Sequence, residues 1–186
     1  MIISISGTQG SGKSTLAQDL AEKLKWPRYY IGGLRREAAK KRGLTLAEYN
    51  KLGENDPATD QEVDFYQKEL GEKSDNFIIE GRTSWYFIPH SFKIYVDVSP
   101  EIGAKRIFKD LELNAGIRNE DKNLNSWEDV LISNNNRFKS DTTRYKQYYD
   151  INVNDKKNYD FVIDASALSP EEAFNQVYAE IKKHLA

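Results

Sequence analysis

The chain has 186 residues with 27 basic and 29 acidic side chains; its formal net charge is −2, and this lack of a basic excess argues against nucleic acid as a partner. The length suits one domain with a full hydrophobic core, and the lack of cysteine excludes disulfides, thiolate metal sites and cysteine nucleophiles. Because no apolar stretch approaches the about 20 residues of a membrane span, we expect a cytoplasmic monomer without membrane contact.

The first predicted element is a buried strand at residues 1–6, a short run rich in β-branched and apolar side chains. A helix is predicted over residues 13–25, where leucines and alanines recur at helical spacing. Between them the chain reads G-x-x-x-x-G-K-S, from Gly7 to Ser14. A strand, a glycine-rich loop and a helix in this order predict a phosphate-binding P-loop, and the alternative is a glycine-rich turn that fits the motif by chance.

The residue types of this loop suit a bound polyphosphate. Glycines allow the backbone N–H groups to face phosphate oxygens, and the helix N-terminus adds the positive end of its dipole. We expect Lys13 to reach the β- and γ-phosphates of ATP, Ser14 to ligate Mg²⁺, and Thr15 to lie in the helix near the nucleotide. The predicted cofactor-binding residues are Gly7, Gly10, Ser11, Gly12, Lys13, Ser14 and Thr15.

Strands and helices are predicted to alternate along the rest of the chain. Short runs rich in Ile, Val, Phe or Tyr predict further buried strands at 28–31, 76–80, 92–97 and 160–164. Helical spacing and helix-start signals predict helices at 34–42, 45–53, 59–73, 100–112, 126–149 and 170–184. The alternation predicts an α/β fold in three layers, with a five-stranded parallel sheet covered on both faces.

Two segments interrupt this alternation. Residues 32–75 insert two or three helices between the second and third strands. Residues 111–149 contain a polar stretch over 114–125, which is interpreted as a mobile loop or a surface excursion, and then a helix rich in Asn, Arg and Tyr.

Charged residues follow two of the predicted strands, at the edge where parallel α/β sheets bind ligands. Glu80 ends the strand at 76–80, and its carboxylate is suited to hold Mg²⁺ through water. Arg82 follows two residues later and is interpreted as a phosphate ligand or as part of a solvent-exposed salt bridge. Asp97 ends the next strand and is interpreted either as support for the P-loop or metal, or as a turn cap.

A second group of charges lies on the helix at 126–149. Arg137, Asp141 and Arg144 have the spacing i, i+4 and i+7, which places them on one helix face. They form either a surface ion-pair ladder or a set in which two arginines bind phosphates and the carboxylate orients one of them or binds a sugar. Together with Arg82 and the pair Arg35-Arg36, they predict a second anion site.

With these residues the chain resembles the nucleoside monophosphate kinases, and within them the cytidylate kinases, especially the short archaeal-type branch. The resemblance covers nearly the whole chain. It rests on the P-loop, on similar stretches at 42–60 and 159–166, and on three motifs: Gly33-Leu34-Arg35-Arg36, Ile79-Glu80-Gly81-Arg82 and Arg137-x-x-x-Asp141-x-x-Arg144.

The resemblance implies the P-loop NTPase form of the α/β fold and phosphorylation of a small molecule, CMP or dCMP, by ATP with Mg²⁺. It implies one domain over residues 1–186, with an acceptor-binding region at 32–75 and a lid at 111–149. The implied catalytic residues are Lys13, Arg137 and Arg144, and Ser14 and Glu80 are the implied metal site. The implied acceptor-binding residues are Arg36, Arg82, Arg137, Asp141 and Arg144.

The chain departs from this branch near the acceptor. Tyr30-Ile31-Gly32 stands where the branch usually has Ser-x-Gly, and the lid stretch is longer, with Arg118 as a candidate lid arginine. Candidates for contact with the base are Asp56, Asp60 and Asp64, each of which is equally interpreted as an exposed helix residue. The alternative functions are a kinase for another acceptor (another nucleoside monophosphate, a nucleoside or a small hydroxyl compound) and a non-enzymatic nucleotide-dependent switch.

Overall fold

A computed structural model describes residues 1–113 and 124–185, with only the backbone of residue 62. Arg118 and most of the predicted polar stretch therefore lie outside the described residues. Within the described part of the chain, no helix combines the length and apolar character needed to cross a membrane.

Five parallel strands form one sheet in the order β2-β3-β1-β4-β5. The strands are β1 (Ile2–Gly7), β2 (Arg28–Tyr30), β3 (Phe77–Glu80), β4 (Phe92–Asp97) and β5 (Phe161–Asp164). The central strand β1 pairs with β3 on one side and with β4 on the other, and all six of its residues are buried. All five strands predicted from the sequence are confirmed, because short apolar runs bounded by turns are typical of buried parallel strands.

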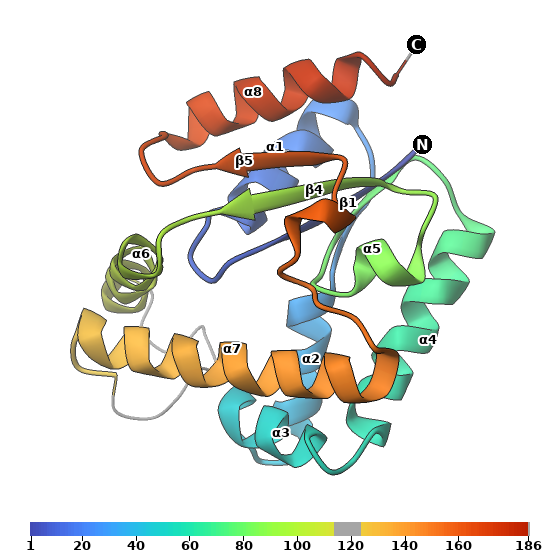
Figure 1. Cartoon of the computed structure of the whole chain (residues 1–186). Coiled ribbons are helices and arrows are strands. Elements are labelled where there is room, and N and C mark those ends of the chain that lie inside the picture. Colours follow the sequence, from blue (N-terminus) through green and yellow to red (C-terminus); the bar gives the residue numbers. More distant parts are fainter. Residues whose placement is uncertain (114–123, 186) are drawn as a thin grey trace.

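Helices cover both faces of the sheet (Figure 1). On one face, α1 (Lys13–Leu24) and α8 (Pro170–Lys182) pack on side chains such as Ile3 and Ile94. On the other face, α2 (Ile31–Lys41), α4 (Ala58–Lys73) and α5 (Ser84–Phe87) surround a second apolar cluster that includes Ile79. The predicted three-layer α/β fold is confirmed.

The sequence missed two short elements, α5 and the 3-10 helix η1 (Lys156–Asn158). Each is only one turn long, too short to produce a hydrophobic period. The sequence also placed the start of α2 three residues late, at 34 instead of Ile31, because Gly32-Gly33 were interpreted as a loop.

The remaining helices are α3 (Leu46–Gly53), α6 (Pro100–Leu113) and α7 (Trp127–Tyr149). The beginning of α7 packs on α6 through Val130. Farther along α7, the Ser140 and Tyr148 hydroxyls donate to backbone carbonyls of α3 at 3.4 and 2.7 Å. The described part of the predicted lid is thus a long helix that reaches from α6 to the inserted helices α2–α4 (Figure 1).

Candidate active site

The P-loop joins the buried end of β1 to the start of α1. Gly12 immediately precedes α1 with φ of +85°, a left-handed conformation that side chains rarely adopt. A Cβ at this position would meet no atom within 4 Å, so the space outside the loop is open. The buried Ser11 hydroxyl has no hydrogen-bond partner among the residues that the structure describes. An open loop with an unsatisfied donor beside a helix N-terminus fits a phosphate group.

Lys13 extends from the first turn of α1 toward the centre of the site. Its Nζ donates to the Thr8 carbonyl at 3.0 Å. Burial, with the positive charges of nearby arginines, lowers the pKa of Lys13 to about 7, although the charge of Glu80 acts in the opposite direction. The site therefore holds a surplus of positive charge that an anion would neutralise.

Ser14 and Glu80, the predicted metal site, are in contact. The Ser14 hydroxyl donates to Glu80 Oε1 at 2.5 Å, and Arg28 forms an ion pair with Oε2 at 2.8 Å. One hydroxyl and one carboxylate are the oxygen ligands that Mg²⁺ prefers, and the usual Mg²⁺ site completes its shell with phosphates and water. A hydroxyl and a carboxylate that lie in contact beside the P-loop therefore fit Mg²⁺.

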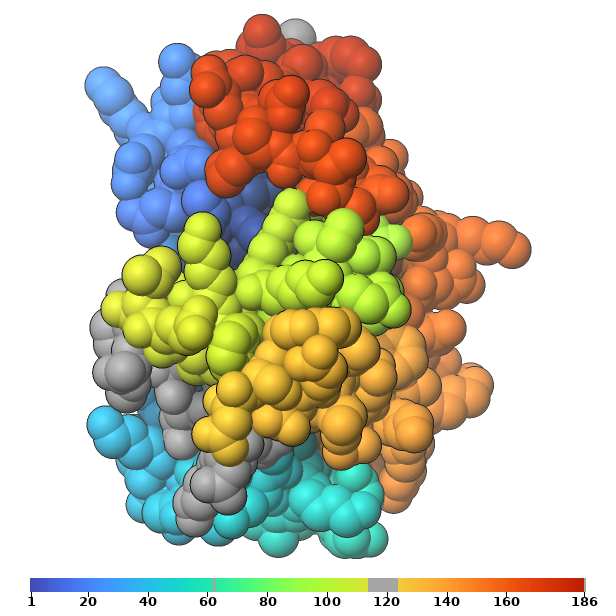
Figure 2. Space-filling view, turned by 90° about the vertical axis from the view of Figure 1, so that its left-hand side faces the viewer, coloured from blue at the N-terminus to red at the C-terminus, as the bar shows by residue number. Residues whose placement is uncertain are grey.

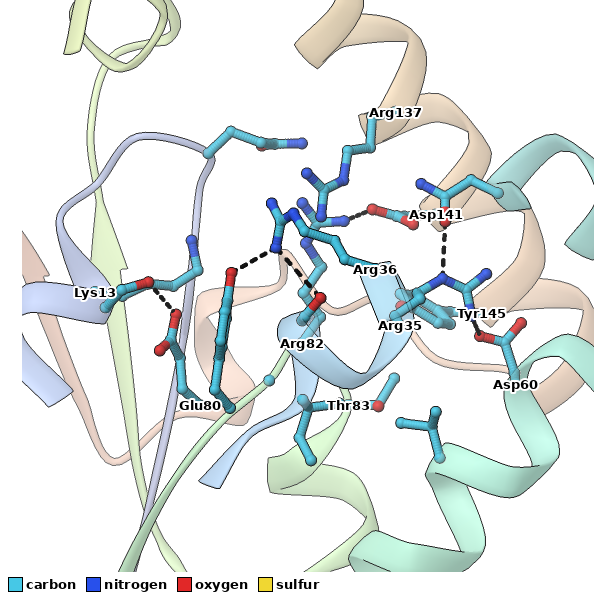
Figure 3. A pocket seen from close by; sticks show the side chains of 18 of the residues that line it. Lys13, Arg35, Arg36, Asp60, Glu80, Arg82, Thr83, Arg137, Asp141 and Tyr145 are labelled. Carbon is cyan, nitrogen blue, oxygen red and sulfur yellow. Dashed lines mark hydrogen bonds and ion pairs between the residues drawn. The ribbon is translucent and has the colours of Figure 1, made fainter. Parts of the chain in front are cut away.

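A cavity of about 90 Å³ lies beside Lys13, between the P-loop, α2, α4, the end of β3 and α7. The side chains of Arg36, Arg82 and Arg137 come from three different elements and converge in it (Figure 3). Burial, and the charges of other arginines, lower the pKa of Arg82. The second anion site predicted from the sequence thus corresponds to a compact group of guanidinium groups.

Asp141 and Arg144 belong to a buried network that continues from this cavity. Asp141 forms ion pairs with Arg82 and with Arg144, the latter at 2.8 Å. Arg144 also donates to Asn50 Oδ1 at 3.2 Å and lies 3.4 Å from Asp60. The network ties the core of the protein to α7, α3 and α4.

The position of Arg144 differs from its predicted one. We expected it to face the acceptor, but its side chain has no exposed area and is absent from the cavity wall. Its guanidinium is held by Asp141, three residues earlier on α7, and lies near Asp60, so it sits behind side chains that themselves line the cavity. The surface-ladder interpretation is also wrong, because the network is buried.

The acidic candidates for base contact have three different positions. Asp56 caps the start of α4 through the backbone of Ala58 and is not part of the cavity wall. Asp60 lines the cavity but is paired with Arg35. Asp64 also lines it, is only 8% exposed, and accepts a hydrogen bond from Tyr149. Asp60 and Asp64 are therefore not exposed helix residues.

Burial raises the pKa of Asp64 to about 6, with a contribution from the charge of Asp60, while the Tyr149 hydroxyl acts in the opposite direction. Next to Asp64, the buried Gln67 side chain bonds Thr83 at 3.3 Å and receives the Ser84 hydroxyl at 2.7 Å. Asp64 and Thr83 both line the cavity, so this part of its wall is polar and includes a carboxylate.

Several residues of this cavity were not candidates in the sequence. An Asn, Thr, Gln or Tyr at a position that no motif specifies carries no spacing signal, and only the fold brings these side chains together. They are Gln9, Asn50, Thr83 and Tyr145. By contrast, Asp97 bonds the next backbone N–H and pairs with Lys156 at 2.6 Å, in agreement with the turn-cap interpretation.

A second, larger cavity of about 550 Å³ lies on the other side of the P-loop. Its walls are the start of α1, α6 and the segment between β5 and α8. Arg106 of α6 donates to the Ala165 carbonyl at 2.9 Å and so holds that segment in place. Figure 2 shows this face of the molecule, where dark blue N-terminal atoms are visible between the red C-terminal segment and the yellow-green α6. Lys13 and Ser14 line both cavities.

Comparisons with known proteins show which proteins the chain is similar to. Residues 3–141 match the family described as AAA domain. A cytidylate kinase from Methanocorpusculum labreanum is 34% identical over 186 residues, which cover 100% of this chain and 98% of that protein. A cytidylate kinase from Natronomonas pharaonis is 35% identical over 173 residues, which cover 92% of this chain and 84% of that protein.

Solved structures share the fold at low sequence identity. An uncharacterised protein from Eubacterium ventriosum superposes with a TM-score of 0.68 at 19% identity. A shikimate kinase from Bacteroides thetaiotaomicron superposes with a TM-score of 0.65 at 13% identity. Both comparisons cover 98% of each chain, and they extend the likeness of the fold to the whole molecule.

Proposed function

Since the chain belongs to the cytidylate kinases, a family of P-loop phosphotransferases, we propose that it transfers the γ-phosphoryl group of ATP to a nucleoside monophosphate, with CMP and dCMP as its acceptors. The observation that carries this proposal is the meeting of two cavities at Lys13, with three arginines on one side and the open P-loop on the other. This arrangement suits transfer between two anions.

In this function the larger cavity takes the donor nucleotide. The P-loop N–H groups and the Ser11 hydroxyl bind its phosphates, and Lys13 contacts the transferring group at the junction of the cavities. Mg²⁺, held by Ser14 and through water by Glu80, would neutralise charge on the donor phosphates when bound.

The smaller cavity takes the acceptor phosphate. Arg36, Arg82 and Arg137 bind its oxygens and stabilise the charge that spreads over the transferring group. An acceptor phosphate is already an anion at neutral pH, so the reaction needs no general base. Arg144 acts indirectly, because it does not line the cavity but holds Asp141 and Asn50, which do, in place.

The volume of the acceptor cavity supports a lid motion. Small-molecule sites usually measure about 300–1,000 Å³, whereas this cavity measures about 90 Å³. A nucleotide therefore enters only after the cavity widens, by a movement of α7 and the inserted helices relative to the P-loop and the end of β3. Their return over the bound nucleotide excludes water, which protects ATP from hydrolysis and strengthens each arginine contact.

The preference for cytosine is supported by Asp64. A carboxylate in the cavity wall accepts a hydrogen bond from an amino group and repels a carbonyl oxygen. Cytosine has an amino group where uracil has a carbonyl, so a base that reaches Asp64 would be selected on that position. Gln67, whose amide already bonds Thr83, fixes the neighbouring surface.

A coupled assay of ADP release tests the proposal. Purified protein with ATP and Mg²⁺ is given CMP, dCMP, UMP, AMP or GMP in separate reactions. We expect selective turnover with CMP and dCMP, and loss of at least about 100-fold in kcat for Lys13→Ala. Lys23→Ala, on the exposed face of α1, is the matched control. Turnover with none of the five acceptors, in protein that still binds ATP, would reject the proposed acceptor class.

A further inference from the structure

Strand β2 carries an aromatic side chain directly into the acceptor cavity. Tyr30 lines the cavity, and its hydroxyl accepts a hydrogen bond from Arg36 Nη1 at 2.5 Å. Arg36 also donates from the same nitrogen to the Gly32 carbonyl at 3.2 Å. These two acceptors hold the guanidinium of Arg36 at a fixed angle over the first turn of α2.

The ring of Tyr30 occupies a place that the adjacent backbone leaves for it. A Cβ on Gly32 would lie 2.9 Å from the Tyr30 ring, and a Cβ on Gly33 would lie 2.7 Å from it. Real Cβ atoms do not approach other atoms so closely, so the two glycines allow the ring to lie against the first turn of α2. The glycines thus have a packing role inside a helix that they would otherwise weaken.

Two arginines flank the same ring. The guanidinium carbons of Arg28 and Arg36 lie 5.5 and 5.9 Å from the ring centroid, within the range of cation–π contacts. Arg28 is also the ion-pair partner of Glu80. Tyr30 therefore connects the carboxylate beside the P-loop with an arginine of the acceptor cavity.

We propose that Tyr30 is a positioning residue, which holds Arg36 in the orientation that receives the acceptor phosphate. The inference rests on the proposed function for the identity of the acceptor, but the orientation of Arg36 is a property of the protein alone. A long arginine side chain loses considerable rotational freedom when it binds an anion. The hydroxyl and ring of Tyr30 remove that freedom before the acceptor arrives.

Tyr30→Phe removes only the hydroxyl and is the main test. We expect KM for the acceptor to rise about tenfold, with KM for ATP and the melting temperature unchanged. Tyr29→Phe is the matched control, since Tyr29 is the preceding residue of β2 and packs on Phe77 and Tyr66 instead. An unchanged acceptor KM, or an equal rise in both KM values, would overturn the proposal.

A double-mutant cycle separates positioning from general packing. In an Arg36→Lys background the effect of Tyr30→Phe should disappear, because the oriented guanidinium is no longer present. Additive effects of the two changes would contradict a role that acts through Arg36. The cycle also distinguishes Tyr30 from residues that influence the acceptor by another route.

A second readout does not depend on catalysis. In ¹⁵N NMR of the unliganded protein, the guanidinium signals of Arg36 should show restricted rotation, which Tyr30→Phe accelerates and Tyr29→Phe leaves unchanged. Unaltered rotation in Tyr30→Phe would reject the inference even if every acceptor were turned over. If no nucleoside monophosphate is turned over but the rotation changes as expected, the proposed function fails and the positioning role stands.

Discussion

Arg82 and Asp141 form an ion pair across the acceptor cavity, and it joins the end of β3 to the middle of α7. Both side chains are largely buried, and the Asp141 carboxylate sits against a guanidinium that the proposed function gives to the acceptor phosphate. Acceptor binding would therefore exchange one anion for another at Arg82. The phosphate would therefore gain less binding free energy from Arg82 than from an unpaired arginine, because the pair with Asp141 is lost.

The first prediction concerns the stability of this network. Asp141→Ala should lower the free energy of unfolding by about 3–5 kcal/mol, because it leaves two buried guanidinium groups, Arg82 and Arg144, without their carboxylate. Urea denaturation followed by circular dichroism measures the loss. Lys146→Ala, which breaks an exposed pair with Asp150 at the end of α7, is the control and should have little effect. Equal losses in the two variants would show that the network is not a source of stability.

The affinity for ATP should depend on pH. Burial and neighbouring arginines lower the pKa of Lys13 to about 7 in the free protein, and bound phosphates would raise it again. ATP binding should therefore take up a proton above pH 7, and its Kd should rise by up to about tenfold per pH unit above that value. Isothermal titration calorimetry in buffers of different ionisation enthalpy measures both effects.

The variant Lys13→Arg provides the control for this pH dependence, because a guanidinium does not titrate in the same range. A pH-independent Kd in the unchanged protein would contradict the prediction. The same pKa shift also makes the stability of the unliganded protein depend on pH. The unfolded chain keeps the Lys13 proton above pH 7 while the folded chain loses it, so this group makes the unliganded protein more stable as pH rises from 7 toward the ordinary lysine pKa.

The third prediction concerns the acceptor base. Asp64→Asn should lower the ratio of kcat/KM for CMP to that for UMP by about tenfold, because an amide can turn a donor toward a carbonyl oxygen. Parallel assays with the two acceptors measure the ratio, and Glu69→Gln, exposed on the same helix, is the control. Because the pKa of Asp64 is raised to about 6, its carboxylate gains a proton as the pH falls below 6. The CMP-to-UMP ratio of the unchanged protein should therefore decrease at those pH values. A constant ratio in Asp64→Asn would remove Asp64 from base selection.

The fourth prediction concerns the metal site. Arg28→Gln leaves the buried Glu80 carboxylate without its cation and should destabilise the protein by about 3 kcal/mol without Mg²⁺. Added Mg²⁺ should restore part of the lost melting temperature, because it replaces the missing positive charge. The unchanged protein should gain less from Mg²⁺, and so should Lys183→Gln, which breaks an exposed pair with Glu180. A gain of the same size in all three proteins would argue against a cation site at Glu80.

The strands and the P-loop were predictable because their signals are local. A buried strand such as β1 needs only a short apolar run, and the glycine spacing of the P-loop places Lys13 and Ser14 without knowledge of the rest of the chain. Glu80 and Arg82 were identified by a general rule, since Glu80 ends a parallel strand and Arg82 follows it, at the edge where ligands bind.

The acceptor side was less predictable because its contacts join distant segments. Helical spacing placed Arg137, Asp141 and Arg144 on one face, but it could not tell which of them faces the cavity. That depends on Asp60 and Asn50, which come from another part of the chain and hold Arg144 behind the cavity wall. The packing of Tyr30 on two glycines could not be predicted either, because glycine in a sequence normally indicates a loop.

The long helix α7 touches both halves of the site. Near its first turns the Gln9 side chain of the P-loop donates to the Asn134 carbonyl at 3.4 Å, and near its last turn Tyr148 bonds to α3. In the proposed function, a helix attached to both parts of the site would make the binding of the two substrates thermodynamically dependent on each other. Any shift of α7 that favours the donor also changes the affinity for the acceptor, and linkage requires that the acceptor change the affinity for the donor by the same factor.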